Sequence, residues 1–172
     1  MDSAEYERLI AARFERFDQD GNGYIDREDF GVAARAVLAE FDTTARSDKG
    51  QDLLAGAEAF WQGMAGIADV DGDQRVTREE FVTGAVKRLR DSPQRFAEIA
   101  RPFLRAVLRI AAGEASGSAT PDAAERVLRI FGVPEAPART AAAALDTGGS
   151  GQISEDACVQ AFAAYFTTPE LD

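Results

Sequence analysis

The chain has 172 residues, with 30 acidic and 19 basic side chains, a formal net charge of -11 and no histidine. So acidic a chain is a poor partner for nucleic acid or for an anionic membrane surface. It lacks the usual general base, a nucleophile motif and a phosphate-binding loop, so we expect no enzyme activity. The one cysteine, Cys158, precludes an internal disulfide and is expected to be a small buried hydrophobe.

The first predicted helix covers residues 4–17 and leads into a segment, 18–29, that is rich in oxygen atoms. Side-chain oxygens stand at its positions 1, 3, 5 and 12 and a backbone carbonyl at position 7, in the order Asp18, Asp20, Asn22, Asp29 and Tyr24. Calcium takes roughly six to eight oxygen ligands, and the chain turns sharply at position 6, where Gly23 stands. The segment resembles the calcium loop of an EF-hand and predicts a metal site, with a helix over 27–40 after it.

A second segment of the same kind, 69–80, follows a long predicted helix that Ser47 caps and that ends at Ala68. Its expected ligands are Asp69, Asp71, Asp73, the backbone carbonyl of Arg75, and Glu80. Position 6 is Gln74, and a side chain held there at positive φ costs roughly 1–2 kcal/mol. Four carboxylates around a dication outweigh that cost, so we predict a second metal site, followed by a helix over 78–90.

The last ligands of the two segments differ in length. Glu80 can hold an ion with both oxygens, which favours the larger, seven-coordinate calcium shell. Asp29 is one methylene shorter and reaches with one oxygen, which lowers the coordination number toward the six that magnesium requires. We therefore expect about two calcium ions per chain, with magnesium able to bind in the 18–29 loop.

The second half contains two eroded copies of the same unit. Residues 146–157 have Gly148 at position 3 and Ala157 at position 12, and residues 112–123 have alanine at both ends. We expect both copies to keep the fold without the metal. Helices are predicted over 92–112, with a kink or break at Pro102, and over 120–132, 137–145 and 154–166.

These patterns together predict an all-α fold of four EF-hand helix-loop-helix units, two intact and two degenerate. The expected halves are residues 1–91, with both intact loops, and 92–172. The acidity follows this division, because residues 1–91 carry 20 acidic and 12 basic side chains. The wide spacing of the first two loops is similar to that of the sarcoplasmic calcium-binding proteins and the calerythrin-like proteins of actinomycetes. That resemblance implies that the four units pack as two pairs into one compact globule, and that the protein is a calcium buffer or signal modulator.

Two functions stay open from the sequence. A calcium buffer is favoured over a sensor that changes conformation to regulate a protein partner, because sensors expose methionine-rich surfaces and this chain has two methionines. No signal peptide or membrane-length apolar run is evident, so we expect a cytoplasmic protein that is a monomer. The short basic cluster 87–90 is interpreted as a solvated helix end.

Overall fold

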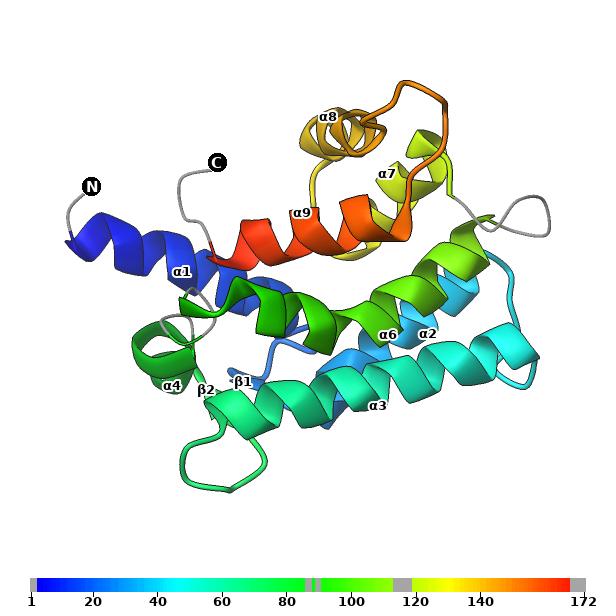
Figure 1. Cartoon of the computed structure of the whole chain (residues 1–172). Helices are drawn as coiled ribbons and strands as arrows, with labels where there is room; N and C mark the ends of the chain where they lie inside the picture. The colour runs from blue at the N-terminus through cyan, green and yellow to red at the C-terminus, as the bar shows by residue number, and fades with distance from the viewer. Residues whose placement is uncertain (1–2, 86–87, 89–90, 113–118, 168–172) are drawn as a thin grey trace.

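The computed structural model describes residues 3–85, 88, 91–112 and 119–167 of the chain. Its described parts are mostly helical, which confirms the all-α prediction (Figure 1). The helices are α1 Ser3–Phe17, α2 Arg27–Glu40, α3 Asp48–Ala68, α4 Arg78–Glu80, α6 Pro93–Ala112, α7 Pro121–Ile130, α8 Glu135–Leu145 and α9 Glu155–Thr167. The strands are β1 Tyr24–Ile25 and β2 Val76–Thr77. In the described parts, no helix is long and apolar enough to span a membrane.

Side-chain caps fix where the helices begin. The hydroxyl of Ser47 accepts a hydrogen bond from the N–H of Gly50 at 3.0 Å, and α3 starts directly after it. Thr120 caps α7 in the same way, and Ser154 accepts from the N–H of Ala157 at 3.1 Å. Each cap satisfies an N–H that the helix itself cannot pair, so these starts agree with those predicted.

Two predicted helices need comment. The helix expected over 78–90 is α-helical in α4, continues as a π-helical turn, η1 Phe81–Ala85, and is α-helical again at residues 88 and 91. Thr83 donates its hydroxyl to the carbonyl of Glu79 at 2.6 Å, and such back-bonding bends helices. Residues 86–87 and 89–90 lie outside the described residues. Of the two outcomes expected at Pro102, a break is wrong, because α6 continues through that residue to Ala112, and a kink stays a prediction.

Short antiparallel pairings join the loops two by two. In the first pair, β1 lies beside β2 with Tyr24 opposite Thr77 and Ile25 opposite Val76. In the second pair, a single bridge joins Ala119 to Ile153, and the N–H of Ile153 donates to the carbonyl of Ala119 at 2.7 Å. Ile25 and Ile153 are the eighth residues counted from Asp18 and Asp146, so both pairings occur at the same position of the loop.

Aromatic rings from both halves of the chain form one core. Phe60 of α3 lies at its centre, with ring centroids 4.9 Å from Phe30, 6.2 Å from Phe96 and 5.9 Å from Phe162. Trp61, the one tryptophan of the chain, is buried beside the Phe30 ring at 6.0 Å. The edge-on and tilted ring pairs are favourable arrangements, and they tie the first two hands to the last helix.

The helices α3 and α6 run side by side across the molecule (Figure 1). Glycine permits this close approach, because a Cβ built on Gly56 would lie 2.9 Å from the Cα of Phe103 and from the carbonyl oxygen of Pro102. Both of these contacts are backbone atoms, which cannot swing aside as a flexible side chain would. The contact at Gly56 therefore sets the distance between the two helices.

We predict that Gly56→Ala lowers the free energy of unfolding by about 1–3 kcal/mol, because the added methyl group overpacks the α3–α6 contact. The matched control is Gly66→Ala in the same helix, where a Cβ would meet no atom within 4 Å. That control removes a glycine from a helix interior and should be neutral or stabilising. Urea unfolding of both variants tests this, and equal stabilisation by the two would contradict the close contact.

Candidate metal centres

The first loop brings three carboxylates together. Oxygen atoms of Asp18, Asp20 and Asp29 lie within 4.8 Å of one another, although these residues are up to eleven positions apart in the chain. Asn22 is oriented beside them, since its Oδ1 accepts from the N–H of Tyr24 at 3.0 Å and its amide donates to Asp20 at 3.3 Å. Converging oxygens of this kind are the donor set that a hard dication requires, so the residues fit calcium or magnesium.

Asp29 is the most deeply buried side chain of this cluster. Its side chain is only 1% exposed and accepts the N–H of Asp20 at 3.1 Å and the N–H of Asp26 at 2.9 Å. The second bond belongs to a capping box at the start of α2, in which Asp26 accepts from the helix in return. Desolvation by burial raises the pKa of Asp29 to about 7. A bound dication would favour the charged form and lower that pKa again.

The second loop is arranged similarly but is more open to solvent. Oxygen atoms of Asp69, Asp71 and Asp73 lie within 4.8 Å of one another. The N–H of Asp73 lowers the pKa of Asp71. The N–H of Arg75 likewise acts to lower the pKa of Asp73. Desolvation and the neighbouring carboxylates of Asp71 and Asp69 outweigh that hydrogen bond, so the pKa of Asp73 is raised. Mutual repulsion among these three carboxylates is relieved when a cation binds between them.

Glu80 stands apart from this trio. Its two oxygens accept the N–H of Thr77 at 3.1 Å and the N–H of Val70 at 2.9 Å, so both are held toward the loop. The bond to Thr77 completes a capping box, as the bond from Asp26 to Asp29 does in the first loop. Asp29 and Glu80 therefore take the same part in the capping boxes of α2 and α4, and they differ in the length of the side chain.

The same hydrogen bond closes the loops that begin at Asp18, Asp69 and Asp146. The carboxylate at position 1 accepts the N–H at position 6 in each, between Asp18 and Gly23 at 2.9 Å, Asp69 and Gln74 at 2.8 Å, and Asp146 and Gly151 at 2.8 Å. The residue at position 6 has positive φ in all three, including 64° at Gln74, which confirms the expected strain in the second loop.

The loop over residues 146–157, the fourth in chain order, is joined to α6 by ion pairs that we did not predict from the sequence. Glu155 accepts from Arg101 at 2.9 Å and from Arg105 at 2.6 Å, and Asp156 accepts from Arg101 at 2.9 Å. These pairs raise the pKa of Arg105 and lower that of Glu155. A signal was present in the sequence, because the two arginines lie four residues apart on one face of α6. Among the described residues, no metal-type cluster occurs in 146–157.

The arginine at position 10 of each of the first two loops forms an ion pair with a helix of the other hand. Arg27 of the first hand binds Glu58 of α3 at 2.9 Å, and Arg78 of the second hand binds Glu15 of α1 at 2.9 Å. All four side chains are about half exposed, so each ion pair is worth little by itself. Their reciprocal arrangement nevertheless connects each loop to the helix that leads into the other.

Comparison with known proteins agrees with this geometry. The family described as the EF-hand domain pair matches residues 6–86. Calerythrin of Saccharopolyspora erythraea is 27% identical over 148 residues, which cover 86% of this chain and 84% of calerythrin. A solved calcium-binding protein of Streptomyces coelicolor, whose structure is described in terms of prokaryotic calcium-mediated regulation, is 66% identical to this chain and has a TM-score of 0.91. The match covers 94% of this chain and 98% of that one. An amphioxus sarcoplasmic calcium-binding protein, 16% identical with a TM-score of 0.70, shares the fold over 100% of this chain and 94% of its own.

The chain therefore belongs to the EF-hand family of calcium-binding proteins. Within that family it is of the calerythrin and sarcoplasmic type, and its relatives in Streptomyces and Saccharopolyspora mark it as bacterial. The resemblance inferred from the loop spacing is thus confirmed.

We predict that Gln74→Gly raises the calcium affinity of the second loop about fivefold, because it removes roughly 1 kcal/mol of strain at positive φ. The reverse change at the same position of the first loop, Gly23→Gln, should weaken that loop by a similar factor. Calorimetric titration of both variants with calcium measures the effect, and an unchanged affinity in Gln74→Gly would show that the strain does not limit binding.

Proposed function

We propose that the chain binds two calcium ions, one in loop 18–29 and one in loop 69–80, and acts as a cytoplasmic calcium buffer or signal modulator. The observation that carries this is the convergence of two carboxylate trios, one in each loop. In the first loop the proposed ligands are Asp18, Asp20, Asn22, the carbonyl of Tyr24, and Asp29. In the second they are Asp69, Asp71, Asp73, the carbonyl of Arg75, and Glu80.

A closed core supports the buffer role. Met64, the methionine inside α3, is fully buried, and Tyr24 and Val70 are the large hydrophobic side chains exposed among the described residues. Those two lie within the loops and do not form a continuous apolar groove. Calcium sensors bind their targets through exposed, methionine-rich grooves, and this surface offers no such feature in the described parts.

A calcium-dependent regulator is the second candidate. It is favoured by the Streptomyces coelicolor protein, which is 66% identical and is described in terms of calcium-mediated regulation. Hydrogen exchange with and without calcium separates the two roles. A regulator exposes apolar surface in α2, α3 or α9 when calcium binds, whereas a buffer gains protection in its loops and changes little elsewhere.

We further propose that the two halves have different tasks. Residues 1–91 form the ion-binding pair, and residues 92–172 form a pair that keeps its shape through hydrogen bonds and ion pairs in place of a metal. The contacts of Asp146 with Gly151 and of Glu155 with Arg101 support this division. Because ions bind the native state alone, occupancy of the first pair stabilises the whole chain, which we take to be a monomer.

We predict about two calcium ions per chain and the loss of one in Glu80→Gln, because the variant removes a charged, two-oxygen ligand. The matched control is Asp156→Asn, which removes the same charge from an acidic residue of the degenerate fourth loop and should leave the stoichiometry unchanged. Equilibrium dialysis measures both. Four tight sites in the unaltered protein, or equal losses in the two variants, would refute the assignment of the loops.

We predict that the two loops differ in their selectivity for calcium over magnesium. Asp29 gives a shell near six oxygens, so magnesium should compete at the first loop, whereas Glu80 gives a seven-oxygen shell that magnesium does not fill. Asp29→Glu should raise the calcium selectivity of the first loop, and Glu80→Asp should lower that of the second. Calcium titration in millimolar magnesium tests this exchange, and equal competition at both loops in the unaltered protein would count against it.

A further inference from the structure

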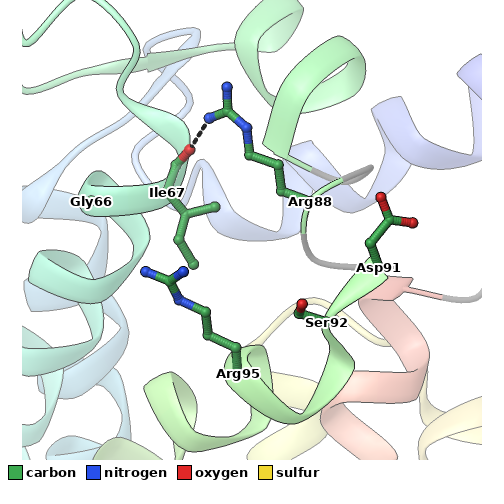
Figure 2. A pocket seen from close by; sticks show the side chains of 6 residues that line it. All are labelled: Gly66, Ile67, Arg88, Asp91, Ser92 and Arg95. Carbon is green, nitrogen blue, oxygen red and sulfur yellow. Dashed lines mark hydrogen bonds between the residues drawn. The ribbon is translucent and has the colours of Figure 1, made fainter.

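A hollow of about 350 Å³ opens where the first half of the chain meets the second (Figure 2). Its walls come from the end of α3, from residues 88 and 91, and from the start of α6. The lining residues are Gly66, Ile67, Arg88, Asp91, Ser92 and Arg95. Its size is at the lower end of the roughly 300–1,000 Å³ found for small-ligand sites. Nothing in the metal-binding role accounts for this hollow.

Positive charge predominates in the hollow, although the whole chain carries a net charge of -11. Arg88 and Arg95 face one carboxylate, that of Asp91. In Figure 2 the two guanidinium groups lie on the Ile67 side of the opening and the Asp91 carboxylate lies on the opposite side. The Arg95 side chain has no hydrogen bond or ion pair among the described residues. It also lies in the first turn of α6, a position where the helix dipole disfavours a cation.

The hollow is connected to the second metal loop through the backbone. Arg88 donates a hydrogen bond to the carbonyl oxygen of Ile67, near the end of α3 (Figure 2). Asp69, the first residue of the loop, follows Ile67 by two positions, and its N–H donates to the carbonyl of Ala65 in the same helix end. A bound dication cancels half of the charge on the four carboxylates proposed as ligands in this loop, which weakens their repulsion of an anion in the hollow.

We propose that this hollow binds an oxyanion of the phosphoryl type, and that calcium in the second loop increases its affinity for that anion. The shared chemistry is a dianionic phosphoryl group, held by the guanidinium groups of Arg88 and Arg95 and by the hydroxyl of Ser92. Its source is either a free phosphate compound or a phosphorylated side chain of a protein. The calcium dependence rests on the proposed function, because it requires an ion in loop 69–80. By linkage, the anion raises the calcium affinity by the same factor.

The test titrates the full chain with inorganic phosphate, and separately with N-acetyl-phosphoserine amide, at constant ionic strength. Backbone amide shifts of Gly66, Ser92 and Arg95 in NMR spectra report binding at the hollow. Each titration is run with calcium, at levels that do not precipitate phosphate, and with a chelator. We expect affinity at least about fivefold higher with calcium, the lower end of measured coupling between sites. Calcium titration of the same samples shows independently whether the second loop is filled.

The variants make the outcome decisive. Arg95→Gln should weaken binding roughly tenfold through loss of charge-assisted hydrogen bonds, and Arg95→Lys should restore part of it. Arg46→Gln is the matched control, since it removes the same charge from an exposed side chain far from α6 in the sequence. Stronger binding of the phosphoserine probe points to a protein source, and equal binding points to a free phosphate. Calcium binding without any phosphate-induced shift, or equal weakening by Arg46→Gln, overturns the inference and leaves the proposed function intact. A second loop that binds no calcium overturns both.

Discussion

The hydrogen bond from the N–H at position 6 to the carboxylate at position 1 is the constraint on which the described loops depend. It closes each loop on itself, forces positive φ at position 6, and turns the chain so that position 8 meets its counterpart in the partner loop. Because Asp146 keeps this bond to Gly151, the fourth loop keeps its shape after losing the oxygens of positions 3 and 12. Loop shape therefore depends on a single carboxylate, whereas ion binding requires a full set of oxygen ligands.

Packing explains how events in one loop reach the rest of the molecule. Phe30 directly follows Asp29 and packs on Phe60, whose ring also contacts Phe96 and Phe162 in the second half. Close-packed protein interiors have low compressibility, so a displacement at one side chain is transmitted to its neighbours. The close approach of α3 to α6 at Gly56 adds a backbone contact that cannot yield. The helices of the two halves thus pack as one unit around a shared core.

The sequence was most informative where one residue type has one physical use. Oxygen spacing located both clusters of acidic side chains, hydroxyls located the starts of α3, α7 and α9, and the sharp turn at position 6 of the loop predicted the positive φ of Gln74. It was least informative where the outcome depends on residues distant in the chain. Pro102 lacks a helical N–H, yet α6 continues through it, packed against α3. The pairing of Glu155 with Arg101 joins residues 54 positions apart, and the hollow beside Ile67 likewise exists only once α3 and α6 are placed together.

The position of Trp61 gives the molecule a built-in optical signal. It is the one tryptophan in the chain, it is 2% exposed, and its ring lies 6.0 Å from that of Phe30, the residue after the last ligand of the first loop. Any movement of α2 that accompanies ion capture changes the packing around the indole, whose emission is sensitive to its surroundings. Trp61 itself lies on α3, which ends at Ala68 directly before the second loop, so a shift of either helix reaches the indole. Intrinsic fluorescence should therefore report on ion binding to this pair of loops without a label.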